Sequence, residues 1–276
     1  MVLRIEDLDP ARCPEAAARL LEDDLRWLGL DWDAGGLDGA GGPWRQSQRT
    51  KVYESAFRQL MEQGMLYPCY CSRAELHAAE APHLSDGRVV YDGRCRALTP
   101  DQRKALETVR RPAWRLRVPD ETISFCDGCL GLYSQNLQKE CGDFILRRSD
   151  GIFGYQLAVV ADDARMGVGQ VVRGSDLVSS TPRQIYLCRL LGLPVPAYYH
   201  IPLLLSPDGR RLSKRDRDTD MGALRARLTP WELTGRLAWM AGLLDQPEPV
   251  PPGALVPLFR WDRIPKQDIV VPADFL

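Results

Sequence analysis

The sequence has 276 residues, 45% of them hydrophobic and 26% charged, with a formal net charge of −1. This composition predicts a soluble globular chain, and the balanced charge excludes a protein that coats nucleic acid through a global basic field. No apolar run approaches the roughly 20 residues of a membrane helix, and no secretion signal is visible at Met1. We therefore expect a cytoplasmic protein with no membrane partner.

Strand and helix patterns alternate along the chain. The predicted elements, in order, are a strand at 2–5, helices at 14–28 and 48–63, strands at 114–118 and 143–148, a hairpin turn at 149–151, a buried segment at 154–163, a buried strand at 168–173, a helix at 181–191, a strand at 200–205 and a turn at 206–209. Such alternation predicts an α/β fold with a parallel sheet.

Cysteine indicates a metal site. Between residues 65 and 96 the pattern changes to short extended pieces rich in Cys, Tyr and Gly. Cys69, Cys71 and Cys95 can supply three corners of a tetrahedral zinc site, with an oxygen ligand in the fourth. Buried free thiols are the alternative. Other candidate ligands are His77 and His83, which we expect at the surface, and Cys126 and Cys129, which could bind metal with Cys141.

A basic loop follows the last predicted strand. It reads Arg-Leu-Ser-Lys-Arg at residues 211–215, after a Pro-Asp-Gly turn. A Lys-bearing loop at the carboxyl end of a strand can bring charge to a polyphosphate, although an ordinary basic loop has the same composition. In this context it resembles the KMSKS loop of class I aminoacyl-tRNA synthetases. Its members are Arg211, Leu212, Ser213, Lys214 and Arg215, and the resemblance implies that Lys214 and Ser213 bind ATP.

Three further motifs, in the same order along the chain, resemble those of the glutamyl-type synthetases. They are Arg-Ile-Glu-Asp-Leu-Asp at 4–9, Tyr-Gln-Leu-Ala-Val-Val-Ala-Asp-Asp at 155–163 and Val-Arg-Gly-Ser-Asp at 172–176. The resemblance implies that Glu6 reads the α-amino group of glutamate, Tyr155 packs against it and Arg173 holds a carboxylate. Taken alone, Glu6 would more often be an acid at a helix entry.

The cysteine spacing resembles one branch of that family, the glutamyl-queuosine enzymes. In that branch a tyrosine, here Tyr91, completes the zinc site with Cys69, Cys71 and Cys95. The short tail after the basic loop, and Val159 where full-length glutamyl enzymes usually carry Asn, favour the same branch. The resemblance implies structural Zn²⁺, Mg²⁺ with ATP, L-glutamate and queuosine-bearing tRNA(Asp). We expect a monomer.

The resemblance also predicts a segment that these residues do not include. The family begins with a central strand and an ATP-binding HIGH motif, so we expect the protein to start about 40 residues upstream of Met1, the length of one strand-loop-helix unit. Activity is expected of the extended form. Two alternatives are a truncated glutamyl-tRNA synthetase charging tRNA(Glu) and an inactive tRNA-binding scaffold.

The motifs divide the chain into four predicted parts. Residues 1–64 and 143–217 form the two halves of a nucleotide-binding domain, without its first strand and HIGH helix. Residues 65–142 form an inserted module with the zinc site on the acceptor side, and residues 218–276 form a short helical tail.

Overall fold

The protein was analysed as a computed structural model that describes residues 1–39, 42–72, 75, 90–212 and 220–272. The first part contains β1 (Val2–Leu3), α1 (Glu15–Trp27), β2 (Ala34–Gly35), η1 (Gln46–Gln48), α2 (Thr50–Glu62) and β3 (Leu66–Cys69). The middle contains η2 (Arg94–Ala97), α4 (Pro100–Glu107), β4 (Ala113–Leu116), β5 (Thr122–Asp127), β6 (Gly131–Asn136), η3 (Leu137–Cys141) and β7 (Phe144–Arg147).

The remaining elements complete the α/β part and form a helical end. They are α5 (Tyr155–Arg165), β8 (Gln170–Gly174), η4 (Ser175–Ser180), α6 (Thr181–Leu191), β9 (Ala197–Ile201), β10 (Leu204–Leu205), α7 (Met221–Arg227), α8 (Pro230–Met240), α9 (Pro252–Leu255), η6 (Val256–Leu258), η7 (Trp261–Arg263) and β11 (Ile269–Val270). The helices and strands predicted from the sequence are present with ends shifted by a few residues, except that the strand predicted at 200–205 is divided between β9 and β10.

Parallel pairing occurs in separate pieces. β1 pairs with β2, β8 with β9 and β10 with β11, each in parallel. In the β8–β9 pair Arg173 stands opposite His200. Among the described strands, β1 and β8 have no hydrogen-bonded partner on their second edge. The predicted parallel α/β architecture is therefore present, but as two-stranded pieces rather than one continuous sheet.

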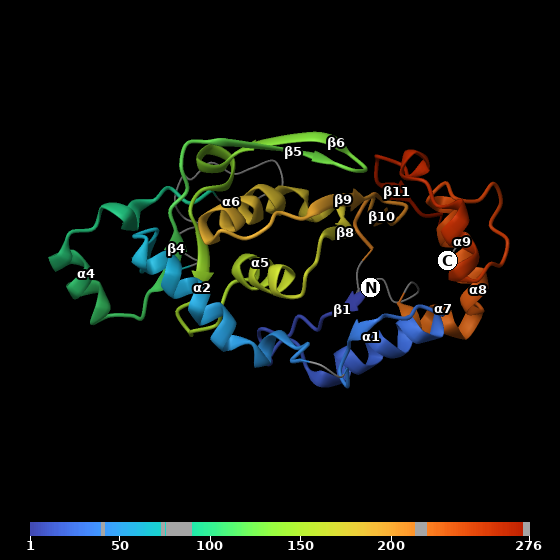
Figure 1. Ribbon diagram of the computed structural model, residues 1–276, viewed down its shortest axis with the longest axis horizontal. Coiled ribbons are helices and arrows are strands. Elements are labelled where there is room, and N and C mark those ends of the chain that lie inside the picture. The colour runs from blue at the N-terminus through green and yellow to red at the C-terminus, as the bar shows by residue number, and fades with distance from the viewer. Residues whose placement is uncertain (40–41, 73–74, 76–89, 213–219, 273–276) are drawn as a thin grey trace.

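Antiparallel strands cover the other side of the helices. β3, β4 and β7 form one sheet, and β5 and β6 form a hairpin. In Figure 1 the hairpin lies along one long side of the molecule, over α6, with α5 next below it. Gly154 immediately precedes α5 and lies against β7, where a Cβ would lie 2.6 Å from the Ile145 carbonyl oxygen, so this tight junction requires glycine.

The main core lies between α2, α5, α6 and the antiparallel strands. Leu60, Leu116, Leu146, Leu157 and Leu187 are fully buried there. Helix boundaries follow local signals. Gly64 and Gly192, both at positive φ, follow the ends of α2 and α6, and α4 and α8 each begin with a threonine capping box. Among the described residues no helix is long and apolar enough to cross a membrane.

Two expectations about burial and continuity are wrong. β8 was expected to be buried, but Val172 is 55% exposed because that part of the strand opens onto a cleft. The strand predicted at 200–205 is interrupted at Pro202, which lies between β9 and β10 and has no amide to donate to a ladder. Part of the apolar stripe of α1 faces solvent, since Leu20 and Leu21 are 60% and 51% exposed.

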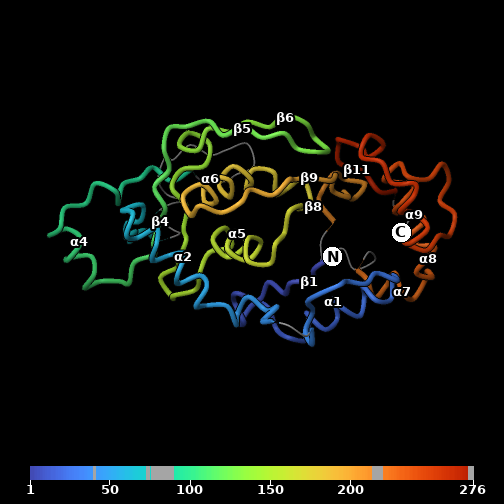
Figure 2. The backbone as a smooth tube through the Cα atoms, viewed as in Figure 1, coloured from blue at the N-terminus to red at the C-terminus, as the bar shows by residue number. Residues whose placement is uncertain are grey.

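The C-terminal region packs against the α/β part in two places. α7 lies beside α1, where Arg225 pairs with Asp24 at 2.8 Å, and the two helices run side by side in Figure 2. Farther along, the Asp268 carboxylate accepts the Leu203 amide at 2.8 Å and β11 pairs with β10. The chain that precedes the basic loop is thus held by the tail.

Candidate active site and metal centre

The three residues predicted to bind glutamate line one cleft. It has a volume of about 650 Å³ and lies between β1 on one side and α5 and β8 on the other. Glu6 follows β1, Tyr155 is the first residue of α5, and Arg173 lies in β8. Val159, one turn after Tyr155, also lines the cleft and is 4% exposed. Segments about 150 residues apart in sequence therefore meet here.

Charge in the cleft is balanced and paired. Arg4 donates to Asp163 at 2.6 Å and to Glu6 at 3.1 Å. Burial raises the pKa of Asp163, and the Arg4 charge opposes that change. The Glu6 side chain remains 42% exposed, so its carboxylate can accept a second, cationic partner from the cleft. Sequence reasoning gave Arg4 and Asp163 no role, although both lie inside the motifs that were recognised.

Tyr155 and Arg173 face the same space. Burial raises the pKa of Tyr155, the Glu6 charge adds to this effect and Arg173 opposes it, so the hydroxyl stays protonated at neutral pH. The Arg173 guanidinium is half-buried. It donates to Thr181 Oγ1 at 2.8 Å and to His200 Nε2 at 3.0 Å, and it lies 5.3 Å from the centre of the Tyr198 ring. A partly desolvated guanidinium of this kind suits a carboxylate ligand.

A buried ionic network supports the cleft from behind. Asp162 is fully buried in α5 and accepts three hydrogen bonds, from Gln46 Nε2 at 3.0 Å, Arg49 Nε at 2.5 Å and Tyr53 Oη at 2.7 Å. Arg4 Nε lies 3.9 Å from the same carboxylate. Hydrogen bonding to Asp162 and burial both raise the pKa of Tyr53, burial contributing most. The network ties α2 and β1 to α5.

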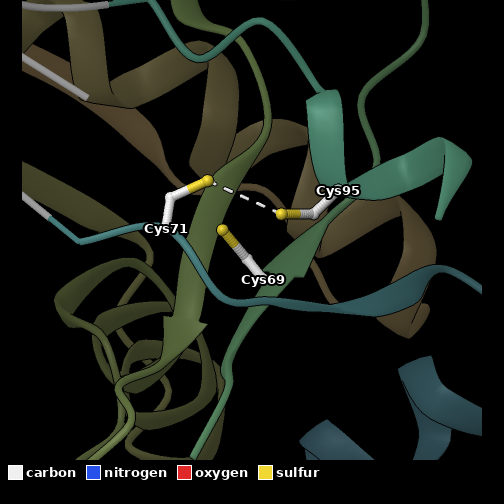
Figure 3. A group of neighbouring side chains, drawn as sticks. All are labelled: Cys69, Cys71 and Cys95. Carbon is white, nitrogen blue, oxygen red and sulfur yellow. Dashed lines mark hydrogen bonds between the residues drawn. The ribbon is translucent and has the colours of Figure 1, made fainter. Parts of the chain in front are cut away.

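The predicted metal ligands form a cluster. The sulphur atoms of Cys69, Cys71 and Cys95 all lie within 4.8 Å of one another, with 3.5 Å between Cys71 and Cys95 (Figure 3). Tyr91 Oη lies 3.5 Å from the Cys69 sulphur and 3.8 Å from that of Cys71. A zinc ion with Zn–S bonds of about 2.3 Å would hold its sulphur ligands about 3.8 Å apart and an oxygen ligand about 3.5 Å from each. These side chains fit such an ion.

Arg115, which sequence reasoning missed, lies against the cluster. Its Nε donates to the Cys69 sulphur at 3.2 Å, and its guanidinium stacks 3.7 Å from the centre of the Tyr91 ring. Hydrogen bonding with Cys95 lowers the pKa of the Cys69 thiol to about 4, Arg115 acts in the same direction, and the same bond raises the pKa of Cys95. Arg115 lies in β4, and the antiparallel pairing of β4 with β3 places it next to the cysteine cluster.

The other predicted site residues are only partly described. Arg211 pairs with Asp176 at 2.6 Å. Leu212 packs against a second apolar cluster, which is formed by Leu224, Leu233, Met240 and Val271. Ser213, Lys214 and Arg215 lie outside the described residues, as do His77 and His83. Cys126, Cys129 and Cys141 do not form a metal-binding group in the described part of the chain, where Cys126 is exposed and Cys129 is buried.

The chain belongs to the class I tRNA synthetases of the glutamyl and glutaminyl type, since the model of that family's catalytic domain matches residues 1–233. It is 50% identical over 279 residues to the glutamyl-Q tRNA(Asp) synthetase of Symbiobacterium thermophilum, covering 99% of this chain and 86% of that protein. It is 47% identical over 281 residues to the protein of the same name from Nitratidesulfovibrio vulgaris, covering 100% of this chain and 86% of the other.

Solved structures give the same class. The glutamate-tRNA synthetase of Elizabethkingia anophelis superposes with a TM-score of 0.83 at 26% identity, and the glutamate tRNA ligase of Elizabethkingia meningosepticum, in complex with its amino acid, with a TM-score of 0.81 at 26% identity. Each match covers 99% of this chain and 61% of the other. The chain thus spans about three fifths of the length of these synthetases.

Proposed function

We propose that this protein activates glutamate with ATP and transfers it to queuosine in tRNA(Asp). The observation that carries the proposal is the meeting of Glu6, Tyr155 and Arg173 in one cleft. Glutamate presents an ammonium group and two carboxylates. The half-exposed Glu6 carboxylate suits the ammonium group, the Arg173 guanidinium suits a carboxylate, and Tyr155 covers the aliphatic part between them.

Activation is an in-line displacement. The glutamate α-carboxylate forms a bond to the α-phosphorus of ATP, the bond from that phosphorus to the bridging oxygen breaks, and pyrophosphate leaves. Mg²⁺ bound with ATP would neutralise charge on the phosphates. Lys214, with Ser213, stabilises the leaving pyrophosphate. In the second step a cyclopentenediol hydroxyl of queuosine attacks the acyl carbon and AMP departs. Protein residues serve to position and stabilise, and none acts as nucleophile.

The names of the relatives support queuosine as acceptor. Val159 supports it further, because an apolar side chain lines the cleft where full-length glutamyl enzymes usually carry Asn. A truncated glutamyl-tRNA synthetase charging tRNA(Glu) is the second candidate, favoured by the structural match to glutamate-tRNA synthetases. A tRNA-binding scaffold without catalysis is the third.

Glutamate-dependent exchange between ATP and pyrophosphate tests the activation step. The assay is run on this chain and on one extended through the upstream in-frame codons. We expect exchange with glutamate and none with aspartate. Absence of exchange from both chains, with metal bound, would favour the scaffold.

We further propose that Cys69, Cys71, Tyr91 and Cys95 hold a structural zinc ion. Tetrahedral closure by three thiolates and a phenolate leaves no open position, so the ion would stabilise the fold and take no part in chemistry. It would fix the segment that precedes α4 against the β3–β4–β7 sheet. Purified protein should contain one equivalent of zinc by elemental analysis, and Cys95→Ser should lose it.

Arg115 should tune this site. Replacing it with Gln removes the guanidinium stacked over Tyr91 and leaves only a shorter, neutral amide to donate to Cys69. We expect zinc affinity, measured by competition with a chromophoric chelator, to fall by about 10- to 100-fold, the usual effect of losing a group that orients metal ligands. Arg189→Gln, at an exposed ion pair on α6, is the matched control and should bind zinc like the wild type.

A further inference from the structure

His200 is a buried imidazole with a defined partner on each nitrogen. It is fully buried in β9 and stands opposite Arg173 in the β8–β9 pairing. Arg173 donates from Nε to His200 Nε2 at 3.0 Å. On the far side, His200 Nδ1 lies 2.6 Å from Asp127 Oδ2. A row of three side chains therefore leads from the end of β5 to the glutamate cleft.

Asp127 anchors this row rigidly. Its side chain is fully buried, and its second oxygen, Oδ1, accepts the backbone amides of Cys129, Leu130 and His200 at 2.9 to 3.1 Å. Burial alone would raise the pKa of Asp127, but these hydrogen bonds and the one from the His200 ring lower it below its ordinary value. The residue is therefore a fixed carboxylate that accepts and cannot donate.

These contacts determine the state of the imidazole. An arginine Nε can only donate, so His200 Nε2 must accept, and the ring proton must lie on Nδ1, from which it donates to Asp127. The charged and polar groups that face the ring are Asp127, Arg173, Asp176 and the Thr181 hydroxyl. Burial, the largest influence, and the Arg173 charge lower the pKa of His200, which agrees with a neutral ring.

We propose that Asp127 and His200 are positioning residues that fix the orientation of Arg173 for a substrate carboxylate. The inference rests on the proposed glutamate-binding role of Arg173. With Nε held by His200 and one terminal nitrogen held by Thr181 Oγ1 at 2.8 Å, the guanidinium plane is set before substrate arrives. Binding then loses less side-chain freedom, which is the usual benefit of preorganisation. In the wrong tautomer His200 would present a proton to the Arg173 donor.

The tautomer itself gives the first test. The chain contains three histidines, so ¹⁵N-histidine spectra have few resonances, and comparison with His200→Gln identifies the one sought. We expect His200 to remain neutral with its proton on Nδ1 at and above neutral pH, without glutamate present. The proposal would be overturned if the His200 ring carried its proton on Nε2, or if it became protonated in the pH range of an ordinary histidine. This outcome does not depend on the protein's activity.

Three substitutions give the second test. His200→Gln places an amide oxygen near Nε2 and keeps an acceptor for Arg173, whereas His200→Asn places its amide near Nδ1 and keeps only the bond to Asp127. Asp127→Asn puts a donor against Nδ1 and should reverse the tautomer. We expect glutamate affinity, measured by calorimetry, to fall about 10- to 100-fold for His200→Asn and Asp127→Asn, and within about fivefold for His200→Gln.

Melting temperature separates positioning from stability, because both His200 variants should melt close together while their glutamate affinities differ. Equal affinities for His200→Asn and His200→Gln would contradict the proposal. The proposal would also be contradicted if the wild type bound glutamate and all three variants bound it with the same affinity. If neither the wild-type chain nor its upstream-extended form binds glutamate, the proposed function fails first, and the inference about Arg173 falls with it.

Discussion

Arg173→Gln should reduce kcat/KM for glutamate in the exchange reaction by about 30- to 5,000-fold. This range corresponds to about 2–5 kcal/mol, the usual loss when one partner of a desolvated, hydrogen-bonded charge pair is removed. The effect should be large because the guanidinium is half-buried and is held in place by His200 and Thr181. Water cannot fully replace a partly desolvated cation of this kind as the partner of a substrate carboxylate. Initial rates over a range of glutamate concentrations measure the change.

Two controls accompany this substitution. Arg173→Lys keeps the charge but loses the planar fork and the Nε contact to His200, so it should restore little of the activity. Arg189→Gln, which alters an exposed ion pair on α6, should stay within about twofold of the wild type, as expected for surface charge. If Arg173→Gln retained normal kcat/KM, the glutamate site would lie elsewhere.

Asp162→Asn should lower the free energy of unfolding by about 3–5 kcal/mol. Removing the negative charge of a buried ionic group leaves the Arg49 guanidinium uncompensated, and the asparagine amide keeps only one of the two oxygens that accept from Arg49 and from Tyr53. Such a loss is a large part of the 5–15 kcal/mol that stabilises an ordinary domain. Urea unfolding followed by circular dichroism measures it.

Asp262→Asn is the matched control for this experiment. Asp262 pairs with Arg260 at 2.7 Å, but both side chains are 65% exposed, so the midpoint of unfolding should not move. A normal midpoint for Asp162→Asn would mean that the network beneath the cleft contributes nothing net to stability.

The sequence predicted the members of the cysteine cluster better than its surroundings. Cys69, Cys71, Tyr91 and Cys95 were named together, and the structure brings all four within ligand distance. Arg115 was missed because its place depends on which strand pairs with β3, and on the register of that pairing. A single sequence carries no local signal for a contact of this kind.

In the cleft beside β1, α5 and β8, the motifs recognised in the sequence predicted residues that line the cleft but not the buried residues that support them. Glu6, Tyr155 and Arg173 meet as expected. Asp162 and His200 both lie within segments that had been singled out, yet their partners Arg49 and Asp127 come from η1–α2 and the β5–β6 hairpin. The segment predicted to be buried at 154–163 contains Asp162, but the identity of the partner of a buried polar residue depends on tertiary packing.

Burial was harder to predict than element type. Helical spacing correctly predicted α1, but Glu22 and Asp24 are its buried residues, while Leu20 and Leu21 are exposed. Periodicity reports which side chains share a helix face, and it does not report what that face contacts. The same limit applies to Val172, whose strand was correct and whose burial was not.

The most direct test of the proposed function is transfer of labelled glutamate to purified tRNAs. The assay uses this chain and its upstream-extended form with three acceptors, which are tRNA(Asp) with queuosine, tRNA(Asp) without it, and tRNA(Glu). We predict label only on queuosine-bearing tRNA(Asp). Label on tRNA(Glu), or equal labelling of both forms of tRNA(Asp), would contradict that prediction.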